Sequence, residues 1–174
     1  MKLLYLLRHA KSSWDEPSLP DIDRPLSKRG RKAAKSMAKH FQTAGIRPDA
    51  VLCSTSKRTR ETFKLLAPAL GEVSVSFDHK IYEASYQTLL ERIIALSPAL
   101  SSVLLIGHNP GVERLALFLM GEQGHGPGVS RLQEKFPTGS LAVLSSPAAD
   151  WKSLAVGSCS LEDFVRPVDL DGEE

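Results

Sequence analysis

Short aliphatic runs alternate with helix-like segments along most of this chain. Residues 3–7, 50–53 and 103–106 are apolar and are bounded by polar, charged or glycine positions. Runs of this kind are typical of strands that are buried on both faces of a sheet. Strands that alternate with helices predict an α/β sandwich with a mainly parallel central sheet.

The first two expected helices have recognisable ends. Ser27 is a suitable N-cap for a helix that runs to about Ala44, and Gly45 is a typical residue just beyond a helix. Spacings of three and four predict the buried stripe of this helix, which consists of Ala33, Ala34, Met37, Ala38 and Phe41. A second helix is expected over residues 57–70, and Pro68 should end or bend it.

The elements that follow are shorter. Residues 73–77 alternate between apolar residues and serine, which is the periodicity of a strand. We expect a third helix over residues 86–96 and a fourth that begins at Asn109 and Pro110. The glycine-rich segment 121–128 is expected to form a loop, residues 141–144 and 154–156 to form strands, and the polar tail after Leu161 to fray.

Composition excludes several classes of protein. The chain has 174 residues, of which 42% are hydrophobic, and a formal net charge of +2. A chain of this length and hydrophobicity can bury a core, so we expect a single domain over residues 1–174. The near-neutral charge argues against a dedicated nucleic-acid-binding protein. No segment approaches the ~20 apolar residues that cross a membrane.

The cysteines and the amino terminus bear on the compartment. Cys53 and Cys159 are the only cysteines, which is too few for a disulfide scaffold and is compatible with a reducing compartment. The first apolar run stops at Arg8, and no small-residue cleavage site follows it, so it is not the core of a signal peptide. We therefore expect a cytoplasmic protein.

Charged and polar residues follow three of the predicted strands. Arg8 and His9 follow the first strand, Ser54 to Arg58 follow the second, and His108 and Asn109 follow the strand at 103–106. Each of these alone has an ordinary structural interpretation as a surface pair, a helix cap or a turn. Because the carboxyl ends of parallel strands meet at one edge of a sheet, we expect these groups to converge.

Such a set suits phosphoryl transfer through histidine. A neutral imidazole is a good nucleophile near pH 7, and His9 would attack through one ring nitrogen while a backbone carbonyl holds the other N–H. Guanidinium groups match the geometry of phosphate oxygens. Arg8, Arg58 and a protonated His108 would stabilise the transition state without a metal, assisted by the helix N-terminus after Asn109.

Several sequence blocks resemble the histidine phosphatase superfamily, whose fold is phosphoglycerate-mutase-like. The first block is Leu6-Leu7-Arg8-His9-Ala10. Further blocks resemble the SixA-type phosphohistidine phosphatase branch and comprise Lys11-Ser12-Ser13-Trp14, Asp23-Arg24-Pro25-Leu26-Ser27 with Gly30, and Ile106-Gly107-His108-Asn109-Pro110. The resemblance extends from Met1 to about Leu119. It implies a three-layer α/β/α sandwich and a phosphatase that needs no cofactor.

The resemblance also implies individual roles. His9 would become phosphohistidine, Arg8 and Arg58 would bind the phosphoryl group, and His108 would bond to a phosphate oxygen. Asn109 is also expected to take part in substrate binding. The family pattern has a serine four residues before the second arginine and a threonine four after it. Ser54 and Thr62 stand in that register around Arg58, whereas Arg60 does not fit it. Thr55 and Thr59 replace the proline and alanine that are common in this block, which places the local backbone in question.

The general acid is harder to assign. Glu83 resembles the carboxylate with which many members of the family protonate the leaving oxygen of a phosphate ester. The ordinary alternative is a surface glutamate near the start of a helix. Phosphohistidine has a nitrogen leaving group that needs less protonation, so Glu83 could be dispensable for that substrate.

The residues of the site are compatible with three functions. The first is a metal-independent phosphatase that acts on phosphohistidine in a protein, for which the short chain leaves little room for a lid. The second is a small-molecule phosphomonoesterase or a mutase, and the third is a non-catalytic phosphate-binding module. The intact His9 argues against the third. The sequence does not define the oligomeric state.

A basic cluster, Lys28-Arg29-Gly30-Arg31-Lys32, stands at the start of the first expected helix. It is either a solvated face or a docking patch for an acidic protein or a phosphorylated ligand. The remaining histidines have no metal-ligand spacing, so no metal site is expected; they are His40, His79 and His125.

Overall fold

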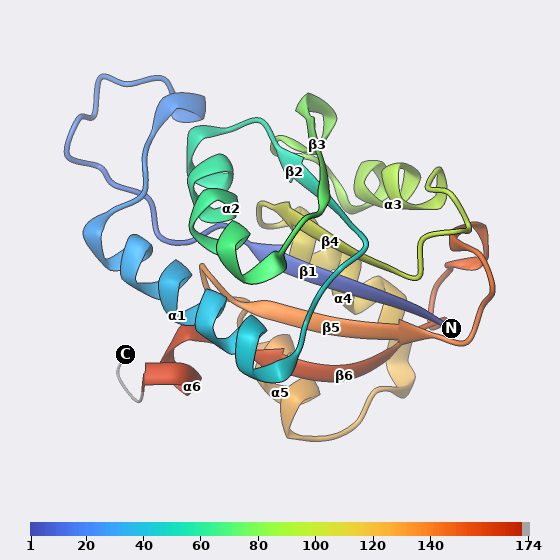
Figure 1. The fold of residues 1–174 in the computed structure, drawn as a ribbon. Helices are drawn as coiled ribbons and strands as arrows, with labels where there is room; N and C mark the ends of the chain where they lie inside the picture. Colours follow the sequence, from blue (N-terminus) through green and yellow to red (C-terminus); the bar gives the residue numbers. More distant parts are fainter. Residues whose placement is uncertain (172–174) are drawn as a thin grey trace.

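A six-stranded sheet separates two layers of helices in the computed structural model of this chain, which describes residues 1–171 (Figure 1). The strand order is β3-β2-β4-β1-β5-β6. The strands are β1 (Lys2–Arg8), β2 (Ala50–Ser54), β3 (Ser74–Asp78), β4 (Ser102–Gly107), β5 (Leu141–Ser146) and β6 (Ser160–Val165). Strands β1 to β4 are parallel and β5 is antiparallel to both its neighbours, which confirms the mainly parallel sheet.

Helices cover both faces of the sheet, as the three-layer prediction requires (Figure 1). One layer contains α1 (Lys28–Ala44), α2 (Lys57–Leu70) and α6 (Pro167–Asp171). The other contains α3 (Tyr86–Ile94), α4 (Gly111–Met120) and α5 (Pro127–Glu134). Short 3₁₀ turns occur at Asp21–Asp23, His79–Ile81, Gly121–Gln123 and Trp151–Ser153.

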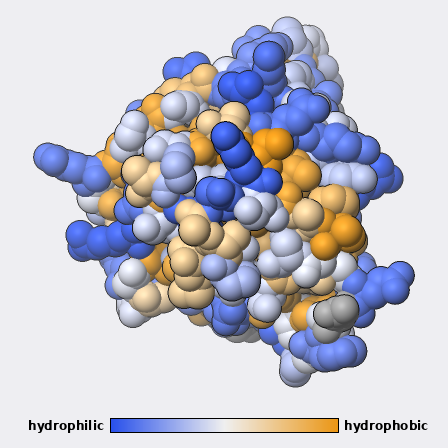
Figure 2. Space-filling view, turned by 90° about the vertical axis from the view of Figure 1, so that its right-hand side faces the viewer, coloured by the Kyte–Doolittle hydropathy of each residue, from blue (hydrophilic) through white to orange (hydrophobic). Residues whose placement is uncertain are grey.

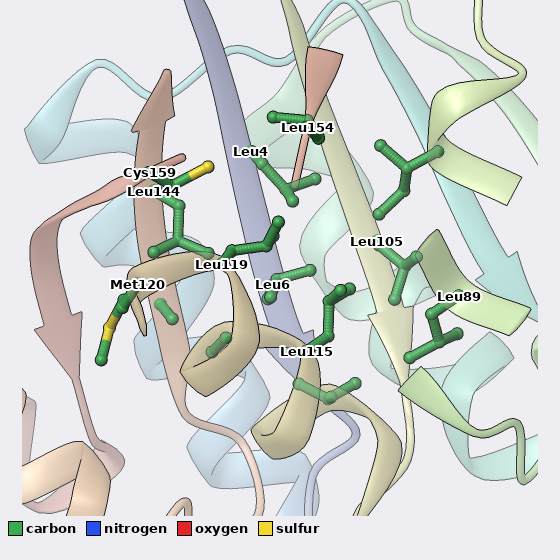
Figure 3. Close-up of a cluster of buried hydrophobic side chains, with 14 of the residues drawn as sticks. Leu4, Leu6, Leu89, Leu105, Leu115, Leu119, Met120, Leu144, Leu154 and Cys159 are labelled. Atoms are coloured by element: carbon green, nitrogen blue, oxygen red, sulfur yellow. The ribbon is translucent and has the colours of Figure 1, made fainter. Parts of the chain in front are cut away.

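Alternation along the central strand β1 divides the core into two halves. Tyr5 and Leu7 pack in the cluster beneath α1 and α2, whereas Leu4 and Leu6 pack in the larger cluster on the opposite face. Figure 3 shows this larger cluster, in which Leu115 and other side chains of α4 lie against β1 and β4. Because successive strand side chains point to opposite faces, one apolar strand supports both helical layers.

Helix α1 has the ends that the sequence predicts. The Ser27 hydroxyl accepts a hydrogen bond from the Gly30 amide at 3.0 Å, and Gly45 follows the helix with a φ of 67°. Ala34, Met37 and Phe41 of the predicted stripe are fully buried, whereas Ala33 and Ala38 are half-buried. The absence of a side chain at Gly30 allows the helix to pack directly on the backbone of Lys11.

The carboxyl-terminal third differs from the prediction in three places. Residues 154–156 form no strand. They lie in a loop in which the Leu154 side chain is buried and the Val156 side chain is 67% exposed. The last strand is β6, which lies within the expected frayed tail and is followed by α6. It is an edge strand with acidic residues on its exposed face, so its sequence looks like a polar tail.

Helix α5 is the third difference. It begins at Pro127, inside the segment expected to be a loop. Proline at the first helical position is favourable, and the buried side chains of Val129 and Leu132 fix the short helix against the core. Several boundaries also differ by a few residues: α3 ends at Ile94 rather than at residue 96, α4 begins at Gly111 rather than at Asn109, and β5 continues to Ser146.

Among the residues that the structure describes, no helix is both long and apolar enough to cross a membrane. Figure 2 views the end of the molecule where the parallel strands begin, and there hydrophilic side chains surround smaller hydrophobic areas. Within the described part of the chain, no three histidine, cysteine, aspartate or glutamate side chains are grouped as a metal site.

Candidate active site

The ends of β1 and β4 bring the two candidate histidines together. These strands are neighbours, with Arg8 opposite Gly107, and the His9 amide donates a hydrogen bond to the Gly107 carbonyl at 3.1 Å. His9 and His108 therefore follow adjacent strands at the same edge of the sheet. Their ring centroids are 5.3 Å apart.

The His9 ring is held in one orientation. Nδ1 lies 2.7 Å from the Ala10 carbonyl oxygen, and because that oxygen only accepts, Nδ1 carries the proton. Burial lowers the pKa of His9 to about 4; the Ala10 hydrogen bond opposes this, and the charges of Arg58 and Arg8 add to it. The ring is therefore neutral at pH 7, and Nε2 carries the free electron pair of a nucleophile.

The His108 ring is held by two polar neighbours. Its Nδ1 lies 3.4 Å from Arg58 Nη2, which only donates, and its Nε2 lies 2.7 Å from Ser54 Oγ. These contacts place the proton of the neutral ring on Nε2. Burial, then His9 and Arg58, lower the pKa of His108 to about 3. Burial and the neighbouring cations therefore favour a neutral His108 in the free site. The protonated His108 expected from the sequence concerns the transition state with a phosphoryl group bound, and it stays a prediction.

Arg8 reaches the site from the last position of β1. Its Nη1 donates to the Phe136 carbonyl oxygen at 2.9 Å, whereas its buried Nε has no hydrogen-bond partner among the described residues. Burial lowers the pKa of Arg8, and the charge of Arg58 acts in the same direction. A buried donor without a partner costs about 1–3 kcal/mol, so a bound anion would be stabilised here.

Arg58 reaches the site from the first turn of α2. The Ser56 hydroxyl caps this helix, and Thr62 donates to the Arg58 carbonyl at 2.7 Å while accepting from the Ala10 amide at 3.1 Å. Thr59, where alanine is common in the family, donates to the Ser54 carbonyl at 2.8 Å. The departure therefore strengthens the turn between β2 and α2.

Asp21 is a centre of the site that the sequence did not reveal. Its carboxylate lies 2.9 Å from Arg58 Nη2, 3.0 Å from Arg24 Nη1 and 2.5 Å from the Tyr82 hydroxyl. Burial alone would raise the pKa of Asp21, but the hydrogen bonds from Tyr82 and Arg58 hold it well below its usual range. Asp21 thus stays ionised and orients Arg58.

The partners of Asp21 extend the site. Burial, the hydrogen bond to Asp21 and its charge raise the pKa of Tyr82 to about 12. Arg24 is buried, and its guanidinium lies 3.2 Å from the ring centroid of the exposed Trp14. Two features of the sequence could have pointed to these residues. Arg24 and Trp14 lie inside the blocks that resemble the family, and Tyr82 directly precedes the candidate acid Glu83.

The remaining candidates lie at the rim or outside the site. Glu83 Oε1 lies 3.9 Å from Arg58 Nη2, and the Glu83 side chain is 59% exposed. The Asn109 side-chain nitrogen donates to the Phe136 carbonyl at 3.1 Å, and its side-chain oxygen accepts from the backbone amide of Glu113. Both polar atoms of this side chain are therefore hydrogen-bonded within the protein. Arg60 is exposed and stacks on Phe77, away from the two histidines.

A pocket of about 450 Å³ opens beside His9. Its charged lining residues are all cationic and come from segments that are distant in the sequence: Arg8, Lys11, Arg24, Arg58 and Lys135. Trp14 and Thr138 also line it. The pocket therefore places a nucleophilic imidazole among guanidinium and ammonium groups, which is an arrangement that can bind an oxyanion and transfer it to nitrogen.

The chain is similar to known proteins in sequence and in fold. An uncharacterized protein of Mycobacterium leprae is 33% identical to this chain over 92% of it and over 99% of the relative. A proposed phosphohistidine phosphatase, SixA, from Agrobacterium tumefaciens superposes with a TM-score of 0.81 and 32% identity, covering 95% of this chain and 98% of that structure.

A further solved structure shares the fold. The protein histidine phosphatase SixA in complex with tungstate superposes with a TM-score of 0.78, covering 97% of this chain and 99% of that one at 22% identity. The family profile described as "Histidine phosphatase superfamily (branch 1)" matches residues 4–96. This chain therefore belongs to the histidine phosphatase superfamily.

Proposed function

We propose that this protein is a phosphatase that removes phosphate from phosphohistidine in another protein through a covalent intermediate on His9. The observation that carries the proposal is the neutral His9 ring, whose Nδ1–H is bound to the Ala10 carbonyl while His108, Arg8 and Arg58 surround it. The similarity to SixA structures favours phosphohistidine as the substrate. The cytoplasmic location stays a prediction.

The first step transfers the phosphoryl group to His9. The Nε2 electron pair attacks phosphorus, and the bond between phosphorus and the substrate nitrogen breaks. The leaving imidazole keeps the electron pair of that bond and takes one proton from water. Arg8 and Arg58 stabilise the negative charge on the phosphoryl oxygens. The Ala10 carbonyl stabilises the positive charge that develops on the His9 ring.

The second step restores the enzyme. Water attacks phosphorus, the bond to His9 Nε2 breaks, and orthophosphate leaves while the proton of the attacking water passes to solvent. The rim residues Lys11, Trp14 and Lys135 are exposed, so the pocket is accessible both to water and to a protein substrate. The guanidinium groups supply the positive charge, so the proposed reaction uses no metal.

One observation favours a second candidate, a phosphomonoesterase that acts on small molecules. Glu83 lies 3.9 Å from Arg58 Nη2, within reach of a bound phosphoryl group, and could protonate an ester oxygen. The two candidates share His9 but differ in the leaving group. The ratio of activity on phosphohistidine to activity on an aryl phosphate distinguishes them.

The test measures phosphate release from a phosphohistidine-bearing protein domain and from an aryl phosphate, both in EDTA. We expect His9→Ala to abolish both activities and His40→Ala, at a half-buried position of α1 outside the pocket, to leave them unchanged. A phosphoenzyme trapped at alkaline pH should be present in the wild type and absent in His9→Ala. Equal rates in wild type and His9→Ala would refute the nucleophile, and loss of activity in EDTA would refute the metal-free reaction.

A further inference from the structure

A second pocket adjoins the one beside His9. It has a volume of about 680 Å³ and lies between the start of α1, the segment 135–138 and the start of α6. Figure 1 shows α1 and α6 side by side at this end of the sheet. We call it the basic pocket, because its ionisable lining residues are five cations and one carboxylate: Lys11, Arg29, Lys32, Lys135, Arg166 and Asp171.

The basic pocket adjoins the pocket beside His9. Lys11, Lys135, Pro137 and Thr138 line both pockets and therefore lie between them. The position of Lys11 is fixed, because its carbonyl accepts a hydrogen bond from the Ser27 amide at 2.9 Å. A ligand with its phosphoryl group at His9 can therefore extend past these residues into the basic pocket.

Cations outnumber carboxylates along the lining of the basic pocket, and one of these cations, Arg166, is already paired with Asp169 at 2.7 Å. The whole chain has a formal net charge of only +2, yet the basic pocket is lined by five cations and one carboxylate. That carboxylate, Asp171, already accepts a hydrogen bond from Ser36 at 2.8 Å. Ala33 and Val168 add apolar surface between the charges. Cations interspersed with apolar surface suit carboxylate side chains, whose short stems pack while their oxygens bind.

Only part of the basic cluster at the start of α1 contributes. Arg29 and Lys32 line the basic pocket, whereas Lys28 does not. Arg31 Nη1 donates to the Leu26 carbonyl at 3.0 Å and supports the loop before the helix. The helix thus directs one side of its cluster toward the active site.

We propose that the basic pocket binds an acidic segment of the phosphoprotein substrate, with aspartate or glutamate side chains in the pocket and the phosphohistidine at His9. This inference rests on the proposed function for the identity of the substrate. The pocket itself recognises carboxylates, so its binding can be measured without catalysis.

The first test measures binding alone. A fluorescent, unphosphorylated peptide rich in aspartate and glutamate is titrated with wild type, with Arg29→Glu/Lys32→Glu and with Lys39→Glu, and the Kd is read from anisotropy. Lys39 is exposed on the same helix outside the pocket, so Lys39→Glu is a control for charge reversal elsewhere on α1. We expect Kd to rise about tenfold in the double variant, because two cations that face the peptide become carboxylates, and less than about twofold in the control.

The second test measures catalysis. In the double variant, KM for the phosphohistidine domain should rise about tenfold while kcat, and the activity on an aryl phosphate, stay unchanged. KM of the wild type should also rise with salt more steeply than KM of the double variant. The neutral variant Arg29→Gln/Lys32→Gln should lie between the two, which separates loss of charge from misfolding.

The outcomes distinguish the two proposals. If the wild type hydrolyses no phosphohistidine but binds the acidic peptide through Arg29 and Lys32, the proposed function fails and the acidic-ligand site stands. If the double variant and Lys39→Glu bind the peptide equally well, the inference is overturned, whatever the enzyme hydrolyses. If peptide binding depends on the pocket but KM for the phosphoprotein does not change, the pocket does not dock this substrate and the inference is equally overturned.

Discussion

His108 Nε2 lies 2.7 Å from the hydroxyl oxygen of Ser54, so the last residue of β2 holds the ring of the second histidine at the nitrogen opposite Arg58. The opposite nitrogen, Nδ1, faces Arg58 and holds an electron pair in the free site. A phosphoryl oxygen beside Nδ1 needs a donor there. Ser54 can both donate and accept, so it can hold either tautomer as well as the protonated ring.

The substitution Ser54→Ala should therefore weaken catalysis through His108. We expect kcat/KM to fall about fivefold, because the lost hydrogen bond contributes ~1 kcal/mol. The ¹⁵N chemical shifts of His108 should change from a single tautomer to a mixture. A variant with an unchanged tautomer but a lower kcat/KM would mean that Ser54 acts only through packing.

The two buried histidines should make the stability of the protein depend on pH. Burial lowers the pKa of His9 to about 4 and that of His108 to about 3, whereas an unfolded histidine has a pKa of about 6.5. The unfolded chain thus binds more protons between these values, so the free energy of unfolding decreases as the pH falls from about 6.5 toward 4. Urea unfolding at a series of pH values measures this slope.

The matched comparison for this slope is His9→Gln/His108→Gln. This variant should lose the part of the pH dependence that the two histidines cause, up to about 1.4 kcal/mol per pH unit for each. Gln42→Ala, at an exposed position of α1 with no ionisable side chain, should keep the wild-type slope. Parallel slopes in all three proteins would show that neither active-site histidine has a lowered pKa.

Glu83→Gln should separate the two candidate substrates. Its carboxylate lies near Arg58, so its loss should slow the hydrolysis of alkyl and aryl phosphates, by about 100-fold for the poorest leaving groups. Phosphohistidine needs less protonation and should be hydrolysed at nearly the wild-type rate. The measurement is kcat on both substrates. An equal decrease on both would exclude Glu83 as the acid.

Gly30→Ala should destabilise the fold and disturb the active site together. A Cβ at this position would lie 2.0 Å from the Lys11 carbonyl oxygen, so helix α1 or the segment after His9 must move. We expect a loss of about 1–3 kcal/mol in the free energy of unfolding and a decrease in kcat/KM.

Gly128→Ala is the control for this steric effect. A Cβ at Gly128, in helix α5, would meet its nearest atom at 3.7 Å, an ordinary contact, and alanine favours a helix by up to ~1 kcal/mol over glycine. Gly128→Ala should therefore be neutral or stabilising in urea unfolding. If both substitutions have the same effect, close packing at Gly30 is not the cause.

The sequence predicted the parts of the fold whose signals are local. Strands β1, β2 and β4 are buried on both faces, and their continuous apolar runs identified them. Ser27 and Gly45 identified the ends of α1. By contrast, β6 is an edge strand with Glu162 and Asp163 exposed, and its place depends on pairing with β5. Local alternation is weak in such a strand, so the polar pattern was misread as a tail.

In the candidate site, too, the residues with local sequence signals were predicted and the others were not. His9, Arg8 and His108 lie directly at strand ends, so the predicted sheet was sufficient to bring them together. Asp21 lies in the long loop before α1, and only the path of that loop brings its carboxylate to Arg58. The three-dimensional course of a loop is not encoded in a local period, which is why this carboxylate was missed.

The backbone pairing of Arg8 with Gly107 has a consequence for how such a site can change. Side chains alternate between the two faces of a strand, so a slip of one residue between β1 and β4 would turn one imidazole away from the other. The distance between the nucleophile and its neighbour is thus specified by hydrogen bonds between main-chain atoms. Substitutions of the side chains around the pocket would therefore leave the spacing between His9 and His108 unchanged in related proteins. An insertion in either strand would change the register and so separate the two histidines.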